Sequence, residues 1–279
     1  MGSRTRKLSS ARLIYLEACA EIAHAFSPFG FRYRRSKPGL VHREGDFIHE
    51  ISFASSRYNL LIPNGQREPL MQALELYGEK HGLGLTPEFI DATVQDSVAL
   101  QLTVSTRSKL LNDWRHRQML PLRRDDYVAG EEIGRLRRPP SVAHFDVGPI
   151  ETRKQSIVEA TVLLKDVAMP FFDCFRKPRD LVGRLVDEEV PGFWEASQFE
   201  YVLCFGGRKN GLALLARYLR DHDLEARFAE LLPEFRTERW RQQSLREVQQ
   251  GMQLGGHPER AGRLAQIAVA HQLDINRWS

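Results

Sequence analysis

Residues 28–35 read Pro-Phe-Gly-Phe-Arg-Tyr-Arg-Arg, and this stretch decides the fold of the first half of the chain. Apolar residues at helical spacing precede it from Ser9 or Ser10 onward, and Pro28 and Gly30 are residues that end helices. After Gly30, aromatic and basic side chains alternate, which is typical of a strand. The stretch therefore predicts a leading helix that turns directly into a sheet.

Further strand patterns follow along the chain. The predicted strands are residues 31–37, 39–43, 47–54, 98–104 and 141–147. Turn sequences separate the first three strands, so we expect these to form an antiparallel meander. A helical face is predicted to begin near Pro69 and to close at Gly82. Residues 121–140 are charged and bounded by prolines, and we interpret them as a loop.

Beyond Gly148-Pro149 the apolar spacing is that of helices, as far as residue 272. The sequence therefore predicts an α+β fold, with an N-terminal helix plus a small antiparallel sheet, followed by a largely helical C-terminal half. We expect residues 1–148 to form the mixed, sheet-bearing region and residues 149–279 the helical region, packed on the first as one compact unit. Residues 206–224 and 255–273 share a weak pattern, which either a duplication or ordinary helix sequence explains.

Composition is that of an ordinary soluble protein with a mild basic excess. The 279 residues include 40 basic and 36 acidic side chains, for a net charge of +4, and 42% are hydrophobic. This excess is weak support for an acidic partner. The cysteines Cys19, Cys174 and Cys204 lie far apart in apolar surroundings, which favours a reducing compartment. No apolar run is long enough to span a membrane, and we expect a cytoplasmic location.

The basic and aromatic residues after Gly30 are the first candidate for a binding surface. On a strand, Arg32 and Arg34 share one face, while Tyr33 and Arg35 share the other. Arginines can hold carboxylates or phosphates by bidentate hydrogen bonds, and aromatic rings can stack on bases. Alternatively, the aromatic side chains pack in the core and the arginines form a solvated outer face. The predicted patch comprises Arg32, Tyr33, Arg34, Arg35, Arg43 and Arg57, with Trp114 as an anchor.

Titratable side chains are densest at residues 42–50. They are His42, Glu44, Asp46, His49 and Glu50. Metal sites and nucleases use this mixture of residues, but Glu44 and Asp46 fall in a turn, and His49 and Glu50 point to opposite faces of a strand. We therefore interpret the group as a polar hairpin and predict no metal and no cofactor. The chain has no recognisable catalytic motif, which favours a non-enzymatic function.

Several short motifs together resemble one known family. A leading helix runs into Phe-Gly-Phe-Arg at residues 29–32, the strand near residues 48–55 ends at a serine, and residues 98–114 combine an apolar strand with a tryptophan-bearing helix. Over residues 10–220 this order is similar to the bacterial family catalogued as domain of unknown function 4304. Residues 60–97 and the tail beyond about residue 233 depart from the family's pattern. The resemblance implies a stand-alone bacterial accessory protein without an established active site, of a kind that includes antidotes encoded beside secreted toxins.

Three hypotheses of function follow. The first is a non-enzymatic protein that binds a protein partner, for instance an immunity protein that neutralises a toxin. The second is a nucleic-acid-binding protein that uses the basic aromatic sheet. The third is an uncharacterised hydrolase or nuclease-like enzyme built around His42, Glu44, Asp46 and His49.

Overall fold

The computed structural model describes residues 10–56, 66–87, 89–90, 97–122, 125–250, 257–273 and 275. The predicted leading helix is α1 (Ser10–Phe26), followed by a short 3-10 helix at Ser27–Phe29. Gly30 has a φ of 79°, and its N–H donates to the carbonyl oxygen of Ser27. A left-handed backbone suits glycine, so this residue turns the chain from the helix into the sheet, as predicted.

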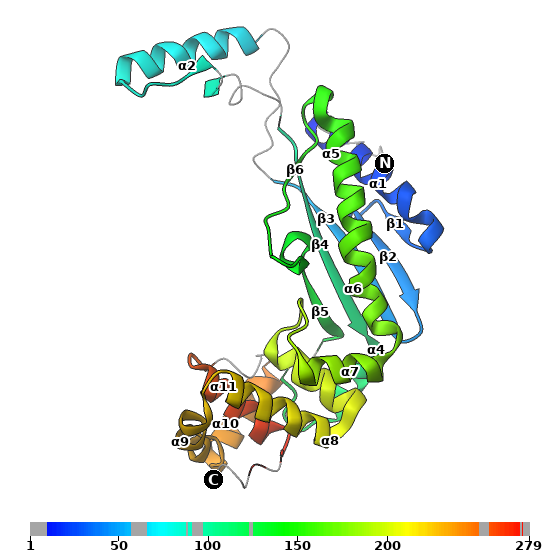
Figure 1. Ribbon diagram of the computed structural model, residues 1–279, viewed down its shortest axis with the longest axis vertical. Coiled ribbons are helices and arrows are strands. Elements are labelled where there is room, and N and C mark those ends of the chain that lie inside the picture. The colour runs from blue at the N-terminus through cyan, green and yellow to red at the C-terminus, as the bar shows by residue number, and fades with distance from the viewer. Residues whose placement is uncertain are drawn as a thin grey trace, which may run out of the picture. The chain divides into compact units, whose positions relative to one another are not determined.

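The sheet has six strands, and five of them follow one another in the order β1-β2-β3-β4-β5 (Figure 1). Their bounds are β1 (Arg32–Arg34), β2 (Gly39–Glu44), β3 (Phe47–Ala54), β4 (Ala99–Ser108), β5 (Tyr127–Glu132) and β6 (Phe145–Asp146). Strands β1 and β2 are antiparallel, with Tyr33 opposite Leu40. Strand β6 pairs antiparallel with β4. The predicted meander is confirmed.

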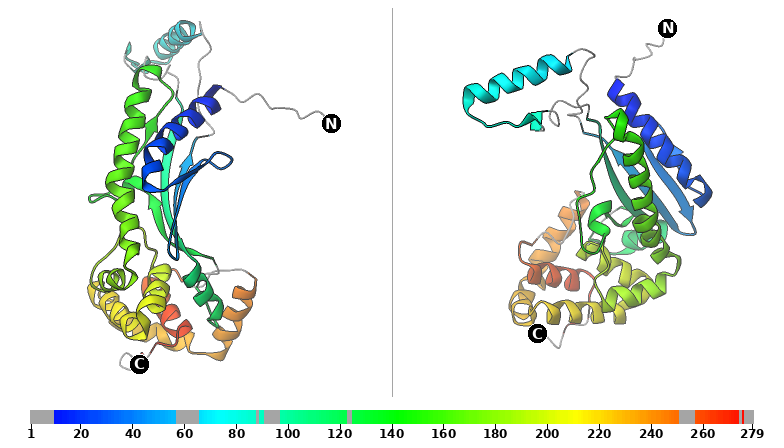
Figure 2. Two further views of the ribbon diagram at one scale, coloured as in Figure 1. Left: turned by 90° about the vertical axis from the view of Figure 1, so that its right-hand side faces the viewer. Right: turned by 45° about the horizontal axis from the view of Figure 1, so that its top comes forward.

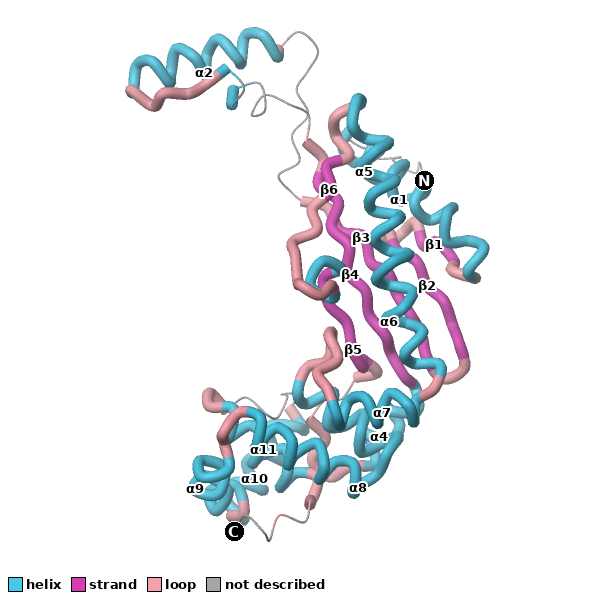
Figure 3. Tube along the Cα trace, viewed as in Figure 1, coloured by secondary structure: helices cyan, strands magenta, loops and turns pink. Residues whose placement is uncertain are grey.

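Helices dominate the second half of the chain (Figure 3). The described helices of this half are α5 (Ile150–Leu163), α6 (Met169–Asp173), α7 (Pro178–Asp187), α8 (Glu195–Asp221), α9 (Glu225–Phe235), α10 (Glu238–Gln249) and α11 (Arg260–Ala270). Two further helices, α2 (Arg67–His81) and α4 (Lys109–Arg117), lie in the first half. A π-helical turn at Leu164–Ala168 connects α5 to α6. The predicted α+β fold is therefore confirmed. Across the described residues, no helix combines the length and the apolar character that crossing a bilayer requires.

The chain divides into two compact units that are interleaved in sequence. The first unit comprises Met1–His42, Glu50–Val104 and Glu132–Met169, and the second comprises Arg43–His49, Ser105–Glu131 and Pro170–Ser279. The predicted division at residue 148 stays a prediction.

In the first unit, α1 and α5 lie side by side against the sheet (Figure 2). The hydroxyl of Tyr15 in α1 donates a hydrogen bond of 2.7 Å to the carbonyl oxygen of Phe53 in β3. Along β4, Leu100, Leu102 and Val104 are buried, whereas Gln101 and Thr103 between them are exposed. This alternation is the one that the sequence predicts, because only one face of the strand meets the core.

In the second unit, the 27 residues of α8 are interrupted at Gly207. Its φ of 76° and ψ of 179° lie in a region that only glycine adopts readily, so two helical segments meet there at a kink.

The interpretation of residues 121–140 as a loop is wrong. Strand β5 lies within this range, and a 3-10 helix at Ile133–Leu136 follows it. Val128 and Ala129 are fully buried, and the N–H of Gly130 donates to the carbonyl oxygen of Gly192 at 2.8 Å. Charged neighbours conceal this short buried run in the sequence, and its hydrogen bonds come from partners distant along the chain.

The two segments of the weak repeat end alike. Asp223 and Gln272 both have a φ of 52°, and the residue after each donates its N–H to a carbonyl oxygen five residues earlier: Leu224 to Leu219, and Leu273 to Ala268. This is the closure typical of a helix C-terminus. Gly255 and Gly256 lie outside the described residues, so the two explanations of the pattern, duplication and ordinary helix sequence, both stay open.

Candidate functional site

The predicted cationic strand is the edge strand β1 of the first unit. Arg32 and Arg34 are exposed on one face, whereas Tyr33 is half-buried on the other. Burial raises the pKa of Tyr33, and its hydroxyl has no hydrogen-bond partner within the described part of the chain. Phe31 is buried, with its ring centroid 6.0 Å from that of Phe26 in an edge-on arrangement. The aromatic side chains thus face the core and the arginines face solvent.

One arginine of this strand has an acidic partner. Arg34 Nη2 donates to Oε1 of Glu50, a residue of β3 that is only 3% exposed. The hydroxyl of Ser52 donates to the same oxygen at 3.4 Å. Arg32 and Arg35 are exposed and form no ion pair with any residue in the described ranges. The edge of the sheet therefore presents a net positive charge.

The remaining residues of the predicted patch do not lie on β1. Arg43 is exposed on β2 and Trp114 is half-buried on α4, and both belong to the second unit. The Trp114 ring centroid lies 5.5 Å from that of His271, so its ring partly packs inside this unit. Arg57 lies outside the described residues. Among the described residues of the patch, Arg32, Tyr33 and Arg34 lie together on β1, and Arg35 follows directly in the turn after this strand. The patch as a binding site stays a prediction.

The titratable side chains at residues 42–50 contact different partners. His49 is buried, with Nδ1 at 3.0 Å from Thr106 Oγ1 and Nε2 at 3.9 Å from Glu44 Oε2. His42 belongs to the first unit, where its Nδ1 lies 3.2 Å from the carbonyl oxygen of Gly30. No group of three or more potential metal ligands occurs among the described residues.

Asp46 from the same group caps helix α4. Its Oδ1 accepts from the N–H of Leu110 at 2.8 Å, and its Oδ2 accepts from the hydroxyl of Ser108. The Ser108 hydroxyl in turn accepts from the N–H of Leu111 at 3.0 Å. Two free N–H groups at the start of the helix are thereby satisfied, one directly by the carboxylate and one through the serine. The role of Asp46 in this structure is thus that of a helix cap.

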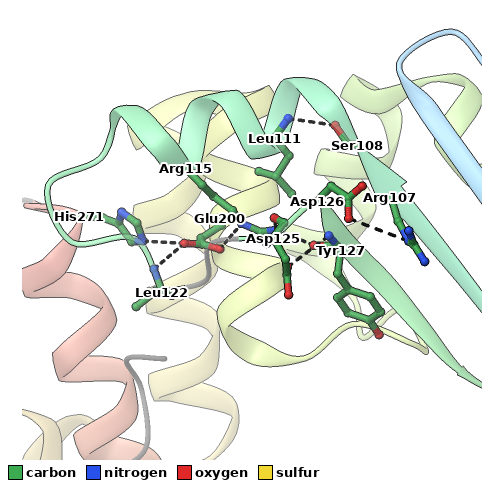
Figure 4. Close-up of polar contacts among 10 residues, drawn as sticks. All are labelled: Arg107, Ser108, Leu111, Arg115, Leu122, Asp125, Asp126, Tyr127, Glu200 and His271. Carbon is green, nitrogen blue, oxygen red and sulfur yellow. Dashed lines mark hydrogen bonds and ion pairs between the residues drawn. The ribbon is translucent and has the colours of Figure 1, made fainter. Parts of the chain in front are cut away.

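A polar centre that sequence reasoning missed lies in the second unit (Figure 4). Arg115 from α4 and Glu200 from α8 are both fully buried, and Arg115 Nε donates to Glu200 Oε2 at 2.6 Å. Arg115 Nη1 also donates to the carbonyl oxygens of Asp125 and Tyr127, at 2.7 Å and 2.6 Å. Glu200 Oε1 accepts from the N–H of Leu122 at 2.7 Å. The pair thus fixes the chain that leads into β5.

His271, at the end of α11, completes this centre. Its Nε2 lies 3.9 Å from Glu200 Oε1, and neither ring nitrogen has a hydrogen-bond partner among the described residues. Burial, together with the positive charge of Arg115, lowers the pKa of His271 to about 4. The imidazole is therefore neutral at pH 7.

A sequence signal for this centre exists. Leu111 and Arg115 are four residues apart, so they share one face of α4. Glu200 is the one charged residue in the run Phe199–Leu203. A lone charge inside an apolar helical run is a candidate for a buried ion pair, because an unpaired buried charge costs too much.

Comparison with known proteins assigns the chain to no family. No protein-family model matches the chain, and no curated protein or solved structure is significantly similar to it. The resemblance to domain of unknown function 4304 therefore stays a prediction.

Proposed function

We propose that the protein acts without catalysis, by binding an acidic surface of a protein partner at the β1 edge of the first unit. The observation that carries this proposal is that Arg32 and Arg35 are exposed without an ion pair to any described residue. Arg34, between them, is oriented by its bond to Glu50. Charges of one sign on an exposed edge speed encounter with an oppositely charged partner and select against others. An immunity protein that neutralises a toxin is the finer form of this proposal.

The orientation of the aromatic residues favours a protein over a nucleic acid. Proteins that bind single strands stack bases on exposed aromatic rings, whereas Phe31 is buried and Tyr33 has its hydroxyl in the core. The strand β1 itself offers exposed cations for salt bridges, and its one aromatic side chain, Tyr33, is half-buried. Cations alone suit a carboxylate-rich protein surface.

Affinity capture from the native host tests the proposal. The wild-type chain and the variant R32E/R35E are compared as baits, with R208E/K209E as a control that reverses two exposed cations of the second unit. We expect wild type and the control to retain the same protein, and R32E/R35E to lose it. A protein that all three baits retain equally would contradict the proposal.

Binding to a labelled single-stranded oligonucleotide distinguishes the nucleic-acid-binding hypothesis from the protein-binding proposal. A protein-binding surface predicts weak binding that R32E/R35E does not change. Tight binding that falls steeply with salt and disappears in R32E/R35E would instead establish a nucleic-acid function.

A further inference from the structure

The segment that follows helix α2 turns back along this helix, within the first unit (Figure 3). Gly82, with a φ of 63°, ends the helix, and the N–H of Leu83 donates to the carbonyl oxygen of Gly78 at 2.9 Å. Gly78 is buried, and a Cβ atom at this position would lie 3.0 Å from the Leu85 side chain. The helix and the returning chain are therefore in close contact at Gly78.

A groove of about 500 Å³ lies beside this contact. Leu85, Pro87 and Ile90 of the returning chain give it an apolar lining, and the glycines of the turn leave it open. The volume is in the range of sites that hold small molecules or large side chains. The lining is thus suited to an apolar group.

The rim of the groove on the α2 side is acidic. Glu75 and Glu79 both line it, and they lie four residues apart, so their side chains share one face of the helix. Neither forms an ion pair with a described residue, and none of the described residues that line the groove is a lysine or an arginine. An occupant with two positive charges about one helical turn apart would neutralise this rim.

Large apolar side chains surround the same segment. Leu76, Tyr77, Leu83 and Phe89 are between 53% and 66% exposed. Single exposed apolar residues are ordinary, but a group of them on one small element is typical of a protein-interaction surface. The groove, its acidic rim and these side chains together describe a surface of defined chemistry.

We propose that this groove binds a segment of a partner protein in which an apolar anchor side chain is flanked by lysine or arginine. The anchor enters the groove beside the Gly78–Leu85 contact, and the flanking cations pair with Glu75 and Glu79. This surface is opposite in charge to the β1 edge. It therefore recognises a different chemistry and does not depend on the function proposed above.

Fluorescence anisotropy of a labelled peptide tests the proposal with the full chain. The probe is Lys-Lys-Leu-Phe-Lys-Lys, and its controls are Glu-Glu-Leu-Phe-Glu-Glu, which reverses the charge, and Lys-Lys-Ser-Ser-Lys-Lys, which removes the anchor. We expect only the first peptide to bind. The variant E75K/E79K should weaken its binding about tenfold or more, because it replaces two ion pairs with two repulsions.

Two further variants separate the site from general charge effects. E75Q/E79Q keeps the shape of the rim and should also weaken binding, whereas E68K reverses an exposed charge of α2 that does not line the groove and should leave binding nearly unchanged. Circular dichroism shows whether each variant remains folded.

Three outcomes would overturn the proposal. The first is no binding of the lysine-leucine peptide at low salt, and the second is equal binding by wild type and E75K/E79K. The third is that the wild-type chain self-associates in sedimentation while E75K/E79K is monomeric, because the groove would then hold a second copy of this chain.

Discussion

Arg115 Nε and Glu200 Oε2 lie 2.6 Å apart, and both side chains are fully shielded from solvent. The two residues are 85 positions apart in the chain and bring α4 and α8 together. Backbone groups at residues 122, 125 and 127 supply further hydrogen bonds to the pair. A buried ion pair of this kind is costly to break on one side, because the remaining charge is left unpaired in a dry environment.

Substitution of Glu200 by Ala is expected to lower the free energy of unfolding by about 3–5 kcal/mol. Urea unfolding measures this change. The control is E188A, which removes one partner of the exposed Arg184–Glu188 pair and should have a far smaller effect, since surface pairs contribute little. Equal losses in the two variants would show that the buried pair is not a main source of stability.

Acid should destabilise the protein through His271. Its pKa is lowered from the ordinary 6.5 to about 4 in the folded state, so between these values the unfolded chain binds the proton more tightly. Stability is therefore full above pH 6.5 and falls as the pH drops toward 4, by on the order of 3 kcal/mol. In H271N this part of the pH dependence should vanish. Parallel stability curves for wild type and H271N over that range would refute the assignment.

Substitution by alanine should have opposite effects on stability at two glycines, one at the kink of α8 and one inside α7. Gly207→Ala should destabilise the protein by about 1–3 kcal/mol, because its φ of 76° and ψ of 179° strain any other residue although nothing blocks a Cβ atom. Gly183→Ala lies in the exposed interior of α7, also without a clash, and should stabilise by about 0.5–1 kcal/mol. Thermal unfolding of both variants measures the difference. A gain in stability for Gly207→Ala would mean that the kink is absent in solution.

Removal of the cap on α4 should have a moderate cost. Asp46→Ala leaves the N–H of Leu110 without its acceptor and is expected to lose about 1 kcal/mol, as for other caps. Asp113→Ala, at an exposed position on the same helix, is the control and should change stability much less. If the Asp46 variant unfolds at the same urea concentration as wild type, the cap contributes nothing.

Much of the fold could be predicted from local patterns. The helix that ends near Gly30, the alternation along β4 and the long helices are all encoded by spacing within one segment. Strand β5 could not be found in this way, because its buried run is only a few residues long and is defined by contacts with distant chain.

The candidate site was predicted only in part. The outward direction of Arg32 and Arg34 follows from strand alternation, but the bond from Arg34 to Glu50 depends on how β1 is placed relative to β3. The Arg115–Glu200–His271 centre joins residues from three helical regions that no sequence spacing relates. Pairings of this kind are decided by tertiary packing, which a single segment does not specify.

The interleaving of the two units determines when each can form during synthesis. The first unit needs residues up to Met169, and the second needs residues beyond Pro170, although both already contain strand residues from the first third of the chain. As the chain emerges from the ribosome, the early residues of the second unit must therefore wait, incompletely packed, until the C-terminal helices are made. A chain released at residue 148 would contain neither unit in full.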